Sequence, residues 1–344
     1  MTRNMKEWVF QIHNSVQRQA VPIMTYPGLQ LIRKNILDVI RDGRTQYESI
    51  KALSIAYPSA AAVTIMDLSV EAEAFGSPVN YSELDVPTVS ARIITDAASA
   101  KRLDVPKIGS GRTGVYLTAA GLAAGNIDDR PTFGGQIGPF SLAGRLCDMT
   151  EIMMALVLDP DLVHTVLEKC ALFLIEYAKA FKEAGANGII IAEPAAGLIS
   201  PQQCSVFSSQ YIKRIVEAVQ DDYFMVVLHN CGNTKQLISS MLSTGAMGLH
   251  FGNSVRMTEI LPQIPWGRLA FGNIDPAGAF KNGTVEQMEA KVWELLHETA
   301  TYKNYVLSSG CDVPPGTPIA NVEAFYRTLE RFNNKVLKSQ VSNF

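Results

Sequence analysis

The sequence predicts an α/β fold, a (β/α)8 TIM barrel with an N-terminal extension and a long insertion after its second strand. Short apolar runs recur along the chain, and loops and segments with helical spacing of apolar residues lie between them. Continuous apolar runs are typical of parallel strands buried on both faces, and their alternation with helices is typical of an α/β barrel. Eight runs fit this description: residues 21–24, 63–66, 137–142, 189–192, 225–228, 247–251, 269–271 and 305–307.

The helices between these runs have clear boundary signals. Asp159-Pro160 places proline at a first helical position, and Gly185 ends the same apolar pattern. Residues 200–203 and 284–287 have the spacing of capping boxes, in which the first side chain bonds the backbone three residues later. The regular alternation of strand and helix therefore favours the barrel.

The chain is longer than a barrel requires. Its 344 residues exceed the length of a typical barrel, about 250, by roughly a hundred. We expect residues 1–344 to form a single domain, with the excess at the N-terminus and in an insertion at about residues 71–130. An insertion after a strand lies on the catalytic face, where it would form a lid or a docking surface.

The composition excludes several classes of protein. Lys and Arg total 30 against 33 Asp and Glu, so the net charge of −3 provides no basic surface for nucleic acid. No apolar run is long enough to span a membrane, and the N-terminus lacks the apolar core of a signal peptide. Five cysteines, an odd and sparse set, are not a disulfide framework. We therefore expect a cytoplasmic protein without nucleic-acid or membrane partners.

Three residues at strand ends predict a metal site. His229 and Cys231 are two positions apart, so on extended backbone they point the same way, and Cys311 follows the eighth strand. Two thiolates, one imidazole and an open fourth position are typical of catalytic zinc. The alternative is a chance His-x-Cys beside buried free cysteines, which are common. Cys170 lies on an apolar helical stripe and is predicted to belong to the core.

Other polar residues near the predicted strand ends are candidates for catalysis or binding. Glu193 is predicted to fill the open metal position or act as a base, or else to be a satisfied polar residue at the barrel mouth. Asp67 and Asp275 are further catalytic candidates, and Asn253 and Asn273 are candidates for binding the cofactor; all four have the alternative role of bracing loops. His250, within the sixth strand, is expected to be a buried core histidine, and Cys147 and Cys204 are expected to be structural.

The ligand set indicates the chemistry. Zn²⁺ with two thiolates and a neutral imidazole has no net charge, which makes it a weak Lewis acid that suits binding a substrate thiol as a nucleophilic thiolate. Hydrolytic zinc sites favour His and carboxylate ligands, although Cys₂His also occurs in alcohol dehydrogenases. The glycine motif at residues 109–114 fits G-x-G-x-x-G but lacks a preceding strand, so we do not expect it to bind a dinucleotide.

Four segments resemble the uroporphyrinogen decarboxylase superfamily, and the resemblance covers nearly the whole chain. They are DLSVEAEAFG at 67–76, GPFSLA at 138–143, GNIDP at 272–276 and GCDVPPGTP at 310–318. Within the superfamily, His229 and Cys231 with Cys311 resemble the branch of zinc methyltransferases that work with corrinoid proteins, such as the methylcobalamin:coenzyme M methyltransferases. The resemblance implies a barrel whose Zn²⁺ activates a thiol that exchanges a methyl group with a methyl-corrinoid co-substrate.

Two departures narrow this expectation. The segment at 22–29, PIMTYPGL, has none of the arginines with which the decarboxylases bind substrate carboxylates, so we discount a metal-free decarboxylase. No histidine follows an Asp at the spacing of the corrinoid motif Asp-x-His-x-x-Gly, so the corrinoid is expected to be free or on a separate protein. Two alternatives stay open: transfer from a methyl donor such as an aryl methyl ether, and a non-catalytic corrinoid- or zinc-binding subunit.

Overall fold

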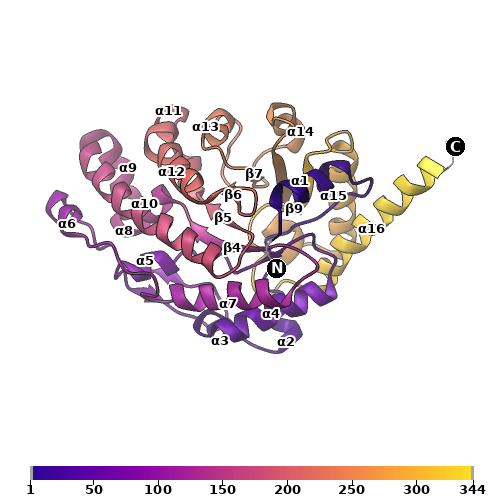
Figure 1. Cartoon of the computed structure of the whole chain (residues 1–344), viewed down its shortest axis with the longest axis horizontal. Helices are drawn as coiled ribbons and strands as arrows, with labels where there is room; N and C mark the ends of the chain where they lie inside the picture. The colour runs from indigo at the N-terminus through magenta and orange to yellow at the C-terminus, as the bar shows by residue number, and fades with distance from the viewer. Residues whose placement is uncertain (1–2, 342–344) are drawn as a thin grey trace.

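Seven parallel strands form one curled sheet, and helices cover its outer side (Figure 1). The structure is a computed structural model that describes residues 3–341. The strands follow one another in the sheet in chain order: β1 (Ala62–Val63), β4 (Thr132–Ile137), β5 (Gly188–Ala192), β6 (Met225–Asn230), β7 (Gly248–Phe251), β8 (Leu269–Ile274) and β9 (Tyr305–Ser309). The predicted α/β barrel fold is thus confirmed, and the fourth to eighth predicted strands coincide with β5 to β9.

The first predicted strand, residues 21–24, is wrong as a strand. Pro22 has no N–H, so this segment cannot complete a ladder. Among the residues described, a single parallel bridge joins Ala20 to Leu307, and Val21 N–H donates to the Leu307 carbonyl at 2.9 Å. On the other side, the Thr25 hydroxyl donates to the Val63 carbonyl at 3.0 Å. This extended segment therefore lies between β9 and β1 and closes the barrel.

The third predicted strand is also misplaced. The strand is β4, which ends at Ile137, and a helix, α8 (Pro139–Cys147), begins two residues later with proline in its first turn. Gly134 and Gly135 interrupt the apolar pattern of β4, so the sequence does not show it as a continuous apolar run. The close approach of a helix requires one of them, because a Cβ on Gly134 would lie 2.5 Å from the Phe181 ring. Of the second predicted strand, residues 63–66, only Val63 lies in a strand, β1 (Ala62–Val63).

Most helices form the outer layer. The longer ones are α1 (Met5–Asn14), α4 (Gly43–Ala56), α7 (Thr113–Asn126), α9 (Met149–Leu158), α10 (Pro160–Glu183), α12 (Gln210–Val219), α15 (Val285–Glu298) and α16 (Ile319–Val341). The shorter α-helices are α2 (Gly28–Ile32), α3 (Ile36–Arg41), α5 (Val70–Ala74), α6 (Ala97–Arg102), α11 (Pro201–Cys204), α13 (Ile238–Ser243) and α14 (Met257–Ile260). The capping boxes predicted at 200–203 and 284–287 are both present. None of the helices described is long and apolar enough to cross a membrane.

Helix α1 closes the end of the barrel where the strands begin. Its residues Met5, Trp8 and Val9 belong to the same buried cluster as side chains from the interior of the barrel. The Trp8 and Phe133 rings lie 5.9 Å apart between centroids. Side chains of α1 therefore fill the end of the barrel interior where the strands begin. A functional site can form only at the opposite end, where the strands end.

The segment predicted as an insertion contains both additional and barrel elements. After β1 come α5, the antiparallel pair β2 (Val79–Asn80) and β3 (Thr88–Val89), and α6. Helix α7, which follows, packs against α4 and β4 as a helix of the outer ring does. The additional elements thus lie before α7, near the carboxyl end of β1.

Candidate metal centre

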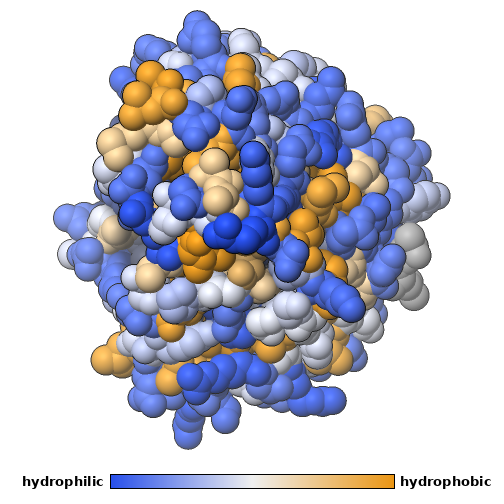
Figure 2. Space-filling view, turned by 90° about the vertical axis from the view of Figure 1, so that its left-hand side faces the viewer, coloured by the Kyte–Doolittle hydropathy of each residue, from blue (hydrophilic) through white to orange (hydrophobic). Residues whose placement is uncertain are grey.

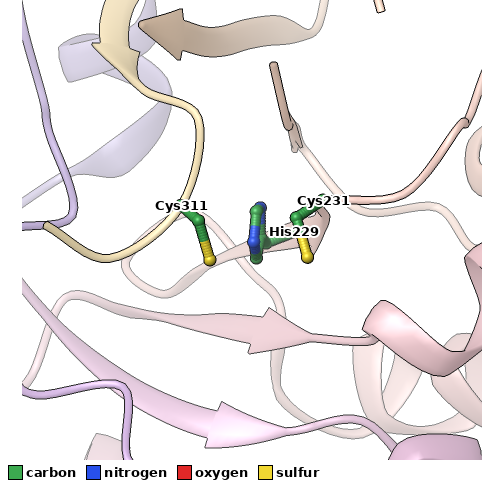
Figure 3. Close-up of side chains that lie close together, drawn as sticks. All are labelled: His229, Cys231 and Cys311. Atoms are coloured by element: carbon green, nitrogen blue, oxygen red, sulfur yellow. The ribbon is translucent and has the colours of Figure 1, made fainter. Parts of the chain in front are cut away.

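Two loops at the carboxyl end of the sheet bring His229, Cys231 and Cys311 together (Figure 3). His229 is on β6, Cys231 comes directly after this strand, and Cys311 is two residues beyond β9. Their ligand atoms all lie within 4.8 Å of one another, and within residues 3–341 no other group of His, Cys, Asp and Glu meets the same criterion. The three residues that the sequence places at strand ends therefore face one point.

Strand alternation explains why His229 points inward. Val227 on the same strand belongs to the interior cluster, and a side chain two residues later points the same way. Cys231 can turn toward the same point because Gly252 lies against its backbone. A Cβ on Gly252 would lie 2.5 Å from the Cys231 Cα, so any other residue would push the loop away.

A chain of hydrogen bonds fixes which nitrogen of His229 is free. The Ser308 hydroxyl donates to the Val21 carbonyl at 2.7 Å, so its oxygen accepts from His250 Nε2 at 2.8 Å. His250 Nδ1 must then accept from His229 Nδ1, also at 2.8 Å. Burial lowers the pKa of His250, which keeps this ring neutral. His229 Nε2 keeps its lone pair, and it is buried without a partner among the residues described.

The two cysteine sulfurs lie close enough for each to shift the pKa of the other. The hydrogen bond from Cys311, assisted by the nearby His229 ring, lowers the pKa of Cys231. The same hydrogen bond and burial raise the pKa of Cys311. A thiolate is thus favoured at Cys231 before any cation is bound, and a bound cation would favour the thiolate at both positions because metal ligation requires deprotonated sulfur.

The donor set fits Zn²⁺. Bonds of about 2.0–2.3 Å in a tetrahedron place ligand atoms within about 4 Å of one another, which small side-chain rotations achieve from the arrangement here. A lone pair on a buried imidazole without a partner is the donor that such a site needs. Two soft sulfurs and one nitrogen also favour Zn²⁺ over Mg²⁺ or Ca²⁺.

Asp67, in the loop after β1, belongs to a buried ion-pair network. Its carboxylate accepts from Arg112 at 2.5 Å, from the Tyr116 hydroxyl at 2.8 Å and from the Ser69 hydroxyl at 2.6 Å. Arg112 also donates to Glu73 at 2.7 Å. The arginine comes from the glycine motif that resembled a dinucleotide fingerprint, so this motif fastens the start of α7 to the end of β1.

Glu193 is held away from the three ligand atoms. Its carboxylate accepts from the backbone N–H groups of Phe140 at 2.9 Å and Ser141 at 2.8 Å, and from the Ser208 hydroxyl at 2.9 Å. The first two donors are at the N-terminus of α8, where a carboxylate is favoured. Burial raises the pKa of Glu193, and these hydrogen bonds oppose the rise. Of the alternatives for Glu193, the contacts correspond to the satisfied polar residue.

The remaining predicted residues lie in the loops around the mouth. The Asn273 amide donates to two carbonyl oxygens of the loop after β7, at 2.8 and 2.7 Å. Asp275 accepts from two backbone N–H groups of the π-helical turn Pro276–Lys281. Asn253 is exposed and lies against Gly310, which precedes Cys311. The contacts of Asn273 and Asp275 are those of loop-bracing residues.

Sequence reasoning missed two residues of the site. His250 is buried as expected, yet it is the hydrogen-bond partner of His229, and the two are paired across β6 and β7. The register of the two strands is the signal that would have found it. Asp312 follows Cys311, and neither of its buried carboxylate oxygens has a partner among the residues described.

The chain matches the profile of one protein family over most of its length. The profile of the family described as uroporphyrinogen decarboxylase (URO-D) matches residues 15–332. The chain belongs to this family. The family resemblance noted in the sequence is therefore confirmed over nearly the full length of the chain.

Relatives with two different names are similar to the chain. Methylcobamide:CoM methyltransferase MtbA of Methanosarcina acetivorans is 30% identical over 75% of each chain. Uroporphyrinogen decarboxylase of Prochlorococcus marinus is 29% identical over 49% of this chain and 48% of its own. The similarity to the methyltransferase thus extends further along the chain.

A solved structure shows the same fold. A methyltransferase from Methanosarcina mazei superimposes with a TM-score of 0.85 at 23% identity, covering 96% of this chain and 99% of its own. The barrel of this family member therefore has the architecture of a protein named as a methyltransferase.

Proposed function

We propose that the chain is a zinc-dependent corrinoid methyltransferase, which moves a methyl group between a methyl-corrinoid and a thiol such as coenzyme M. The observation that carries the proposal is the free lone pair of His229 Nε2 facing the sulfurs of Cys231 and Cys311. Relatives named as methylcobamide:CoM methyltransferases support the choice of reaction. Zn²⁺ held there would supply one function, lowering the pKa of a substrate thiol.

The reaction needs little acid–base chemistry from the chain. The thiol proton leaves to solvent, the sulfur forms a bond to the methyl carbon, and the carbon–cobalt bond breaks with its electron pair remaining on cobalt. His229, Cys231 and Cys311 would hold the Zn²⁺ to which the thiolate binds, and His250 would fix the orientation of the His229 imidazole. Glu193 and Asp67 hold the surrounding loops in place, which keeps these ligands in register.

We propose that the corrinoid arrives free or on a separate protein. The chain has no corrinoid motif of the type Asp-x-His-x-x-Gly, as the sequence shows. Figure 2 shows the side on which α6 and α9 lie, with apolar patches set among hydrophilic residues. Apolar side chains exposed after β1, β4 and β5 include Leu84, Val157 and Leu198, and they suit contact with a large partner.

Metal content and methyl transfer test the proposal together. We expect about one zinc per chain by plasma mass spectrometry, and loss of most zinc and of thiol methylation by methylcobalamin in Cys231→Ala and Cys311→Ala. Cys147→Ala is the matched control, because Cys147 is buried at the end of α8 and is not among the three candidate ligands. It should keep both zinc and activity.

Two results would contradict the proposal. One is full methyl transfer by a metal-free variant that lacks both cysteines. The other is turnover of a porphyrinogen that chelators do not affect, which would return the chain to the decarboxylase branch despite the missing arginines.

A further inference from the structure

A cavity of about 310 Å³ reaches the loop that carries Cys311, because Asp312, the next residue, is among those that line it. The end of β1, the β2–β3 hairpin and the loop after Cys311 form its walls, and Tyr26, Met66, Thr88 and Asp312 are among the residues that line it. Its volume is at the lower end of the range for small-molecule pockets, about 300–1,000 Å³. The volume of the cavity therefore suits a small molecule, and Asp312 is the lining residue that adjoins a candidate ligand.

The buried end of this cavity carries two unused polar groups. Both carboxylate oxygens of Asp312 and the hydroxyl of Tyr26 are buried without a partner among the residues described. The neighbouring acid Asp67 is already paired with Arg112. Leaving such groups unpaired is costly, so a ligand with several N–H donors would satisfy them.

The open end of the cavity has the opposite character. Arg145 and Lys281 are exposed and line the cavity, and the side chain of neither forms an ion pair or hydrogen bond with a residue that the structure describes. The acid on this side, Asp85, accepts from the backbone N–H of Val86 at 2.8 Å. Two free cations at the rim favour an anionic group on the ligand.

We propose that the thiol substrate is of the amino-acid type and carries both an ammonium group and a carboxylate. The ammonium group donates to Asp312 and Tyr26, and the carboxylate lies between Arg145 and Lys281. A thiol that carries only an anionic group, such as 2-mercaptoethanesulfonate, leaves Asp312 unpaired. The inference rests on the proposed function, because it names the substrate class of the same site.

Three matched thiols test the inference by calorimetric titration of the zinc-loaded full chain. L-homocysteine carries both groups, 4-mercaptobutanoate lacks the ammonium group, and 3-mercaptopropylamine lacks the carboxylate. We expect L-homocysteine to bind about tenfold or more tightly than either of the others, the usual effect of a hydrogen bond to a charged group. Binding is measured without any corrinoid, so the readout does not depend on activity.

Two variants test which group of the thiol binds at each end of the cavity. Asp312→Asn should weaken L-homocysteine about tenfold and change the affinity for 4-mercaptobutanoate by less than about twofold. Arg145→Gln should weaken both carboxylate-bearing thiols by a similar factor and leave 3-mercaptopropylamine unchanged. Zinc content is measured in each variant, since Asp312 adjoins Cys311. If Asp312→Asn loses zinc, Tyr26→Phe probes the same end by removing a single hydroxyl.

The outcomes separate the inference from the proposed function. If 4-mercaptobutanoate or 3-mercaptopropylamine binds as tightly as L-homocysteine, the inference is wrong and the methyltransferase proposal stands. If no thiol binds to the zinc-loaded chain, or the chain takes up no zinc, both are wrong.

Discussion

At the scale of single residues, the orientation of one imidazole decides what the site can bind. His229 has two nitrogens, and the chain through His250 and Ser308 to a backbone carbonyl leaves Nε2 as the one with a free lone pair. Partners of this kind tune metal ligands because they hold the ring and its tautomer before the metal arrives. The same buried chain would make reorientation of the ring costly.

His250→Phe should therefore weaken zinc binding. Phenylalanine fills the space of the imidazole but cannot accept from His229 Nδ1, so the ligand loses its fixed tautomer. We expect the zinc dissociation constant to rise about 10- to 100-fold, measured by competition with a chromophoric chelator. His164→Phe is a suitable control, because His164 pairs with Tyr211 on the outer helices. Unchanged zinc affinity in His250→Phe would contradict the role assigned to the hydrogen-bond chain.

The sequence predicted the candidate ligands but not their support. His229, Cys231 and Cys311 were found because strand ends can be located from apolar runs, and chemistry gathers there. Whether Glu193 faced the metal or the backbone depended on the position of α8, which the sequence analysis had misread as a strand. His250 was missed because strand register is a property of the sheet and is not readable from one strand.

At the scale of elements, α5 holds a buried acid, Glu71, at the carboxyl end of β4. Glu71 accepts from the Ile137 N–H at 2.9 Å through one oxygen, and the other oxygen has no partner among the residues described. Burial raises the pKa of Glu71 to about 8. Between about pH 4.3, its value in an unfolded chain, and pH 8, folded Glu71 keeps a proton that the unfolded chain has released. The free energy of unfolding therefore falls as pH rises through this interval.

Glu71→Gln should remove this loss. Glutamine keeps an oxygen for the Ile137 N–H and has no proton to release, so the variant should gain stability over the wild type as pH rises. We expect similar melting temperatures near pH 4–5 and a clearly higher value for the variant at pH 8, measured by calorimetry at both pH values. Glu217→Gln on the exposed face of α12 is the control. Equal pH dependence in Glu71→Gln and the wild type would contradict the assignment.

The position of α1 predicts that a substitution in this helix lowers the stability of the fold without changing zinc affinity. Trp8 is buried against the interior strands at the end of the barrel opposite the metal centre. Trp8→Ala should lower the free energy of unfolding by about 3–5 kcal/mol and leave zinc affinity unchanged in the folded protein, as measured by denaturant titration and chelator competition. Phe10→Ala, on the exposed face of the same helix, should change neither. Loss of zinc affinity in folded Trp8→Ala would show that the two ends are coupled.

Strands and helices were predicted correctly where apolar runs or capping residues marked their positions in the sequence. β5 to β9 are continuous apolar runs, and α10, α11 and α15 have caps that the sequence displays. The errors came from residues with a second role. Pro22 prevents ladder hydrogen bonding in an otherwise apolar run. In β4, glycine is required at two positions because neighbouring side chains occupy the space that a Cβ would need.

At the scale of the whole molecule, the barrel has one closed and one open end. Helix α1 fills the end where the strands begin, and the candidate ligands lie at the other end, where the elements added after β1 also begin. The closure between β9 and β1 relies on an irregular segment, which also supplies Tyr26 to the cavity. The cavity and the candidate ligands meet at the loop of Cys311 and Asp312, and the proposed reaction requires the thiol to bind at this end of the barrel.

Zinc-edge X-ray absorption of the zinc-loaded chain, before and after adding a thiol, tests the central claim most directly. We predict one nitrogen and two sulfurs around zinc at rest, with Zn–S distances of about 2.3 Å, and a third sulfur once the thiol is bound. A first shell without sulfur would contradict the assignment of Cys231 and Cys311. A sulfur count that no thiol changes would contradict the claim that this centre binds and activates the substrate.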